Sequence, residues 1–309
     1  MKKRWLFIPV AGLLILGIIL GTFLDFDINK GIFDPQNGFG LFMAAFSETP
    51  AYLAFGVIAF GFIYLAHKEY KKPWQMCVLY TFAIVMLGCC TYFQGKHIFD
   101  VNAYYTTDTT TKLLGYGIGL TIGLLGALLG YFLITKKSCT NKQLLLILVA
   151  LCVVLGVANG LNNLLKIIFC RPRFRTAIIG EYHIEFTNWW EISKNRSYKQ
   201  YILKNFLAVT KDEFKSFPSG HMANIFTICY IIPMFKNINN KIKGKEEVLF
   251  LLPLIWCVLT AYTRMRVGAH YLSDVCFGSL IGLGSIYIAN EIYRYLLKRF
   301  DEPQIAEAK

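Results

Sequence analysis

Three short stretches of this chain bring together a lysine, three arginines, two histidines and an aspartate. They are Lys166-Ile-Ile-Phe-Cys-Arg-Pro-Arg173, Pro218-Ser-Gly-His221, and Thr263-Arg264 followed by His270 and Asp274. Each stretch borders a long apolar run, and ionisable groups beside membrane spans are costly and usually mark function. Fixed cations bind phosphate oxygens, and a histidine oriented by a carboxylate can attack phosphorus. These residue types predict a phosphate-binding pocket with a nucleophile and an acid.

The third block is the most specific. His270 and Asp274 lie four residues apart and therefore share one face of a helix. A carboxylate at this spacing can accept a hydrogen bond from one ring nitrogen, which fixes the tautomer and leaves the other nitrogen for attack. Arg264 would add planar, bidentate recognition of phosphate. The alternative for this block taken alone is a histidine–aspartate pair that caps a span.

The first block places two cations at the outer end of a predicted span. Lys166 and Arg173 are seven residues apart, close to two helical turns, although Pro172 is expected to disturb the helix. Arg173 is the preferred phosphate contact, and Arg171 is an alternative. If neither binds phosphate, the cations of this block simply extend to the membrane interface, as lysine and arginine commonly do.

The second block stands at the start of a predicted span. Ser219 and Gly220 would leave backbone N–H groups available there, and the beginning of a helix favours an anion. Gly220 would also let the backbone approach a phosphate oxygen closely. His221 would then lie beside the bound anion. The alternative is a helix cap followed by an interfacial histidine.

The composition indicates an integral-membrane protein. The 309 residues are 55% hydrophobic and only 17% charged, with a mean hydropathy of +0.46, and the apolar residues gather in long runs. The net charge of +13 comes from short clusters beside these runs, as in cytoplasmic loops, so we expect no nucleic-acid partner. The nine cysteines show no metal-site spacing, so neither a disulfide framework nor a metal site is expected.

The apolar runs predict an all-α, polytopic transmembrane bundle of about eight spans, each roughly 20 residues long. The runs cover residues 5–24, 51–67, 75–94, 113–135, 144–166, 221–235, 248–262 and 275–297. We expect one integral-membrane domain over residues 1–309. Its predicted parts are N-terminal spans in 1–143, a catalytic core in 144–297 with an outer loop at 176–217, and a cytoplasmic tail in 298–309.

The charge pattern predicts the orientation. With the N-terminus inside, lysine-rich loops fall on the cytoplasmic side, as the positive-inside rule requires. These loops are residues 67–72, 136–142 and 236–245, with the tail from residue 294. All three blocks then fall on the outer side, and both termini are cytoplasmic. The outer loop at 176–217 is predicted either to guide a lipid head group as a lid or interfacial helix, or to be an ordinary loop.

The order and spacing of the blocks resemble the type 2 phosphatidic acid phosphatase (PAP2) family, which shares its site with vanadium haloperoxidases. The resemblance covers roughly the C-terminal third to half of the chain. It implies that His270 attacks phosphorus, that Asp274 orients the resulting phosphohistidine, and that His221 protonates the leaving oxygen and then activates water. The phosphate contacts that it implies are Lys166, Arg173, Ser219, Gly220 and Arg264. The family has proline where this chain has Phe174, which keeps Arg171 as an additional candidate.

The resemblance favours the membrane lipid phosphatase branch. It implies hydrolysis of lipid phosphate or diphosphate monoesters, with no cofactor. The charge pattern places this reaction at the extracytoplasmic face, and the richness in Lys, Asn and Ile suggests an AT-rich bacterial genome and hence a bacterial plasma membrane. A lipid-linked phosphotransferase with the same site is one alternative, and a non-enzymatic transporter is another. Charges gathered at one membrane face, rather than at the midplane, disfavour the transporter. The lipid, the oligomeric state and the role of two spans beyond the family's six stay open.

Cys139 tests the orientation, because it lies in a basic loop expected in the cytoplasm. In a variant that keeps only this cysteine, a membrane-impermeant maleimide should label the protein only after the cells are permeabilised. Labelling in intact cells would contradict the orientation.

Overall fold

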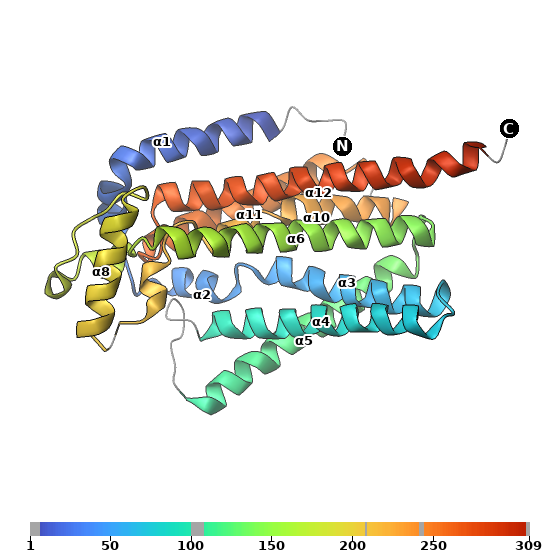
Figure 1. Cartoon of the computed structure of the whole chain (residues 1–309), viewed down its shortest axis with the longest axis horizontal. Coiled ribbons are helices and arrows are strands. Elements are labelled where there is room, and N and C mark those ends of the chain that lie inside the picture. The colour runs from blue at the N-terminus through green and yellow to red at the C-terminus, as the bar shows by residue number, and fades with distance from the viewer. Residues whose placement is uncertain (1–6, 100–107, 208, 241–243, 307–309) are drawn as a thin grey trace. The chain divides into compact units, whose positions relative to one another are not determined.

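The computed structural model describes residues 7–99, 108–207, 209–240 and 244–306. Within these ranges the chain is helical and contains no strand, which confirms the predicted all-α class (Figure 1). The longer helices are α1 (Phe7–Ile32), α3 (Thr49–Lys68), α4 (Pro73–Ile98), α5 (Thr109–Ile134), α6 (Asn141–Phe169), α11 (Glu246–Arg266) and α12 (Leu272–Ala306). The shorter ones are α2 (Gly38–Phe46), α7 (Phe174–Ala177), α8 (Ile192–Asn205), α9 (Gly220–Ile225) and α10 (Ile228–Met234). The 3₁₀ turns are η2 (Gly180–Tyr182), η3 (Lys211–Phe214) and η4 (Phe235–Asn237).

Seven helical stretches of the described residues are long and apolar enough to cross a membrane. The remaining predicted span, residues 221–235, is helical but is divided into α9, α10 and η4. The first span also differs from its predicted bounds, since α1 continues to Ile32. Asp25 and Asn29, which lie beyond the first predicted span at residues 5–24, are therefore part of a membrane-type helix and are buried there.

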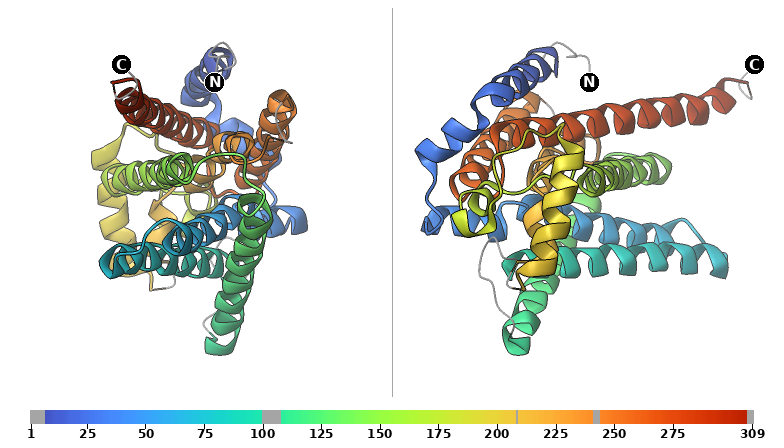
Figure 2. Two further views of the ribbon diagram at one scale, coloured as in Figure 1. Left: turned by 90° about the vertical axis from the view of Figure 1, so that its right-hand side faces the viewer. Right: turned by 60° about the vertical axis from the view of Figure 1, so that its left-hand side comes forward.

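The chain forms two compact units, and each is discontinuous in sequence. The first contains Met1–Ser47, Val157–Phe226 and Ile255–Gly284, and the second contains Glu48–Gly156, Thr227–Leu254 and Ser285–Lys309. All three chemical blocks fall in the first unit. The second unit contains α3, α4 and α5, which pack against one another, and α5 crosses α4 at an angle (Figures 1 and 2).

Glycines let the helices of the second unit approach backbone to backbone. A methyl group on Gly126 of α5 would lie 2.2 Å from the carbonyl oxygen of Leu53 in α3. One on Gly119 would lie 2.5 Å from the carbonyl oxygen of Thr91 in α4. Small residues of this kind allow close van der Waals packing between membrane helices, where no hydrophobic driving force brings them together.

The outer loop at 176–217 is built around its own small core. Ile184, Ile202, Val209 and Phe214 are buried together there. Its main helix, α8, lies across the end of α6 in Figure 1. Asn195 is fully buried and donates from Nδ2 to the carbonyl oxygen of Phe169, 3.1 Å away, at the last turn of α6. The side chain of Asn195 therefore caps the helix that carries Lys166.

Gly126→Ala should destabilise the second unit, because the added methyl group overlaps the α3 backbone and overpacking of this kind costs about 1–3 kcal/mol. The matched control is Gly117→Ala on the same helix, where an added methyl group meets nothing within 4 Å. Thermal unfolding in detergent should show a lower Tm for the first variant and no loss for the second. Equal Tm values would contradict the close approach of α3 and α5.

Candidate active site

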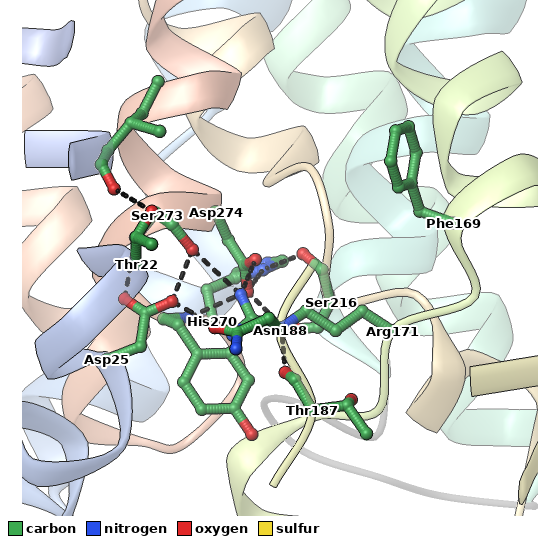
Figure 3. Close-up of polar contacts among 12 residues, drawn as sticks. Thr22, Asp25, Phe169, Arg171, Thr187, Asn188, Ser216, His270, Ser273 and Asp274 are labelled. Atoms are coloured by element: carbon green, nitrogen blue, oxygen red, sulfur yellow. Dashed lines mark hydrogen bonds and ion pairs between the residues drawn. The ribbon is translucent and has the colours of Figure 1, made fainter. Parts of the chain in front are cut away.

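His270 lies in the turn between α11 and α12, and its ring is held by a backbone carbonyl. Nδ1 is 2.6 Å from the carbonyl oxygen of Ser216 (Figure 3). A carbonyl oxygen can only accept, so Nδ1 carries the proton and the lone pair of the neutral ring is on Nε2. The backbone N–H groups of Ala269 and His270 both donate to the carbonyl oxygen of Arg264, which brings that arginine's backbone to the same turn.

The turn depends on Gly268. Its φ of +67° is in the left-handed region that favours glycine. A methyl group there would also lie 2.5 Å from the ring of Phe33. The position therefore has neither the space nor the backbone conformation for a side chain, which explains the glycine directly before the Ala269–His270 pair.

Asp274 reaches His270 chiefly through Ser216. The carboxylate is fully buried, and its Oδ2 accepts from the Ser216 hydroxyl at 2.5 Å and from the Tyr271 N–H at 2.8 Å. Nδ1 of His270 is 3.8 Å from the same oxygen. The sequence predicts a direct bond between this aspartate and the ring, but the closest acceptor for the ring is the Ser216 carbonyl. One serine thus contacts both members of the pair.

Arg171 is completely buried between two carboxylates. Nη1 donates to Oδ1 of Asp274 at 2.7 Å and to the Ser273 hydroxyl at 2.9 Å, and Nη2 donates to Oδ2 of Asp25 at 3.0 Å. Nε donates to the carbonyl oxygen of Thr187 at 3.0 Å. The guanidinium also lies 3.9 Å from the ring centroid of Tyr271. Figure 3 shows its end within the cluster of Asp25, Ser273 and Asp274, so this cation is engaged by the protein itself.

Arg173 is positioned by η3 of the outer loop. Its N–H donates to the carbonyl oxygen of Glu213 at 2.9 Å, and its Nε donates to that of Asp212 at 3.0 Å. The Glu213 carboxylate binds Arg175 and the hydroxyl of Thr176. Burial alone would raise the pKa of Glu213. The hydrogen bonds from Arg175 and Thr176, with the nearby arginine charges, instead lower it below its ordinary value. Glu213 therefore stays ionised. Its bonds to Arg175 and Thr176 hold the segment that contains Arg173 in place.

His270 is surrounded by positive charge. Burial, together with the charges of Arg173 and Arg264, lowers the pKa of His270 from its ordinary 6.5 to about 3, while Asp274 opposes this change. Arg264 is completely buried. The ring is therefore neutral at physiological pH, which is the form in which Nε2 has a lone pair.

Lys166 and the second block meet at Gly220. A methyl group on Gly220 would lie 3.0 Å from Nζ of Lys166 and 3.0 Å from Nδ2 of Asn162, so only glycine leaves this space. The side chain of Ser219 caps α9, and its N–H donates to the carbonyl oxygen of Asp274 at 3.0 Å. The first, second and third blocks are thus connected by direct contacts or close approach.

His221 is buried, and its described contact is with α2. Nε2 is 3.0 Å from the carbonyl oxygen of Ala44. Because that carbonyl accepts, Nε2 carries a proton, and Nδ1 is the nitrogen that can exchange one. The predicted role of His221 beside the phosphate stays a prediction.

Residues that sequence reasoning missed complete this site. Asp25, Ser216 and Ser273 are buried and hydrogen-bonded within the Arg171–Asp274 cluster. Asp25 carries one usable signal, since a carboxylate inside an apolar helix is costly and needs a partner. The two serines have no such signal. Ser216 lies in the loop before α9 and binds the ring of His270 through a backbone carbonyl, which any residue has, and a buried serine such as Ser273 is common in membrane helices.

The fold and the site together define an all-helical, membrane-type protein with a cationic site around a buried, neutral histidine. Residues 147–298 match the family model of the PAP2 superfamily, and this match suggests phosphatase activity. No curated protein and no solved structure matches the chain.

The lowered pKa of His270 predicts a loss of stability in acid. The unfolded ring takes up a proton below about pH 6.5, whereas the folded ring does so only near pH 3. The contribution of this group is therefore complete above about pH 6.5 and is lost as the pH falls toward the folded pKa. Between about pH 6.5 and pH 4, the Tm of the wild type should fall more than that of His270→Asn. If the curves of Tm against pH run parallel for the two proteins, the fold does not hold His270 neutral.

Proposed function

We propose that this protein is an integral-membrane phosphatase that hydrolyses lipid phosphate or diphosphate monoesters through a phosphohistidine intermediate. The observation that carries the proposal is the 2.6 Å bond from Nδ1 of His270 to the Ser216 carbonyl, which leaves the lone pair on Nε2. The ring is also neutral, with a pKa of about 3, so this lone pair is available at physiological pH.

Binding of the phosphoryl group is assigned to the side chains of Lys166, Arg173, Arg264 and Ser219 and to the backbone N–H of Gly220. The backbone N–H of Ser219 is not assigned to phosphate, because it donates to the carbonyl oxygen of Asp274. Arg173 takes the phosphate contact in preference to Arg171, because the guanidinium of Arg171 is used by Asp25, Asp274 and Thr187. Phosphoryl transfer depends mainly on positioning and on stabilising the charge of the equatorial oxygens, and three fixed cations supply both without a cofactor.

In the first step Nε2 of His270 attacks phosphorus, and the bond from phosphorus to the leaving oxygen breaks as the bond to nitrogen forms. His221 donates a proton to that oxygen. The positive charge that develops on the ring of His270 is balanced by Asp274, whose Oδ2 is 3.8 Å from Nδ1. The N–H at Nδ1 remains bonded to the carbonyl of Ser216, so the ring keeps its orientation throughout.

In the second step water attacks phosphorus and the bond to Nε2 breaks. His221 takes the proton from this water and is thereby restored for the next cycle. Because Nε2 of His221 donates to Ala44, the proton enters and leaves through Nδ1. Each group thus returns to its starting protonation state.

The lipid substrate and the side of the membrane rest on the sequence pattern. Seven apolar helical stretches support a location in the bilayer, where a phosphate on a lipid is the substrate that reaches a site at a helix end. The positive-inside pattern supports an extracytoplasmic site with both termini in the cytoplasm. The Lys, Asn and Ile richness of the sequence is the ground for placing it in a bacterial plasma membrane.

His270→Asn in purified protein tests this function. Phosphate release from a panel of lipid monophosphates and diphosphates with matched tails should fall by about 10³-fold or more, as expected when a nucleophile is removed. His183→Asn is the matched control, since His183 is an exposed histidine of the same unit and asparagine tolerates its φ of +50°. Wild-type protein incubated with ³²P-labelled substrate should yield an acid-labile phosphoprotein that the first variant lacks.

Three outcomes separate the alternatives. Unchanged release by His270→Asn would refute the mechanism. Release that requires an added alcohol or sugar acceptor would favour the lipid-linked phosphotransferase. No release by the wild type from any lipid would refute the phosphatase and favour the transporter.

A further inference from the structure

The buried residues of α1 form one narrow stripe, beside which the ring of Phe26 contacts Phe174 and Phe186. These buried residues are Gly21, Asp25 and Asn29, which are spaced by four and therefore share one face of the helix. Within the apolar window of this helix only 6% of the residues are buried, so most of its surface faces outward. The contacts of this stripe are polar or backbone contacts, and they lead directly to the third block.

Asp25 contacts the residues that surround Asp274. Its Oδ2 accepts from Nη2 of Arg171 at 3.0 Å and from the Ser273 hydroxyl at 2.5 Å, and its Oδ1 accepts from the Ser273 N–H at 3.0 Å. Figure 3 shows Asp25 on the opposite side of this cluster from Ser216. One arginine is therefore shared between a carboxylate of α1 and the carboxylate next to His270.

Asn29 contacts the nucleophile's own backbone. Its Nδ2 donates to the carbonyl oxygen of His270 at 3.0 Å and to that of Met265 at 3.2 Å. Gly21 makes this approach feasible, because a methyl group there would lie 2.7 Å from the backbone nitrogen of Ser273. α1 thus holds both ends of the stretch from Met265 to Ser273, in which His270 lies.

The charge balance explains what Asp25 contributes. A buried guanidinium paired with a single carboxylate would be drawn fully toward Asp274 and would neutralise it. With Asp25 as a second partner, Arg171 sits between the two, and Asp274 keeps part of its negative charge for the ring of His270. A carboxylate on a largely exposed apolar helix is costly, and such residues usually have a functional role.

We propose that Asp25, assisted by Asn29, is a positioning residue that aligns Asp274 and His270 from a helix outside the 147–298 segment. This inference rests on the proposed function, since it concerns the same histidine. Asp25 touches no reacting atom and acts through Arg171 and Ser273. The site is therefore complete only when α1 is docked.

The test compares Asp25→Asn with Asp27→Asn, which makes the same change at an exposed position of the same helix. For Asp25→Asn, kcat should fall by about 10²-fold, the cost of a small misplacement in a site of this kind. KM should stay unchanged, because Lys166, Arg173 and Arg264 remain. Asp27→Asn should match the wild type in both constants.

Vanadate, which mimics phosphate at the transition state, distinguishes a positioning role of Asp25 from a purely structural one. The fraction of protein that binds vanadate counts the folded sites. If Asp25 positions the nucleophile, kcat per vanadate-binding protein falls. If Asp25 only anchors α1, that fraction falls and kcat per binding protein stays at the wild-type value, which would overturn the inference.

Two further variants keep the inference testable if Asp25→Asn does not fold. Asn29→Ala removes only a neutral side chain, and it should lower kcat without changing KM. An unchanged kcat would overturn the inference. In an Arg171→Gln background, Asp25→Asn should lower kcat by a smaller factor than it does in the wild type. The reason is that Asp25 and Arg171 act through the same contact.

The proposed function and this inference fail in different ways. Wild-type protein that releases phosphate from no lipid would refute the proposed function. An active wild type in which Asp25→Asn behaves like Asp27→Asn would refute the inference alone.

Discussion

A single buried cation, Arg171, imposes the main constraint on the site. A guanidinium taken out of water must be paired and hydrogen-bonded, or its burial costs several kcal/mol. Arg171 meets this requirement with Asp25, Asp274, Ser273 and the carbonyl of Thr187. These partners come from α1, from α12 and from the outer loop. The pairing of this one charge thus brings the three sequence segments of the first unit together around Asp274.

The segment from Asp212 to Ser219 connects that cluster to Arg173 and to the ring of His270. Its carbonyl oxygens hold Arg173, and the N–H of Ser216 donates to the carbonyl of Arg171. Ser216 also binds the ring of His270 through its carbonyl and Asp274 through its hydroxyl. The outer loop therefore positions Arg173, Asp274 and the ring of His270. Its own core, around Ile202 and Phe214, gives the loop a fixed shape.

Periodicity and motif spacing predict much of this molecule, and their failures have physical causes. The helical class and most spans follow from apolar runs, and the blocks containing Lys166, Gly220 and His270 follow from residue type and order. Arg171 and Arg173 cannot be separated by spacing, because what distinguishes them is a long-range partner, Asp25, 146 residues away in the chain. Ser216 contributes a backbone carbonyl, which any residue possesses, so no sequence signal identifies it. The division of residues 221–235 into short helices is likewise a matter of packing, since the composition is that of a continuous span.

The same arrangement accounts for both charge states that the proposed chemistry requires. Before attack, burial and the arginine charges keep His270 neutral, and the carbonyl of Ser216 selects the tautomer with its lone pair on Nε2. When a phosphate dianion binds, its charge offsets the nearby cations, and the electrostatic penalty for a positive ring becomes smaller. Asp274 then lies close enough to stabilise the positive ring, and its sharing of Arg171 with Asp25 limits how far that arginine neutralises it. In the proposed mechanism, a carboxylate on α1, outside residues 147–298, would thereby affect the energy of the phosphohistidine, because it sets how much negative charge faces His270.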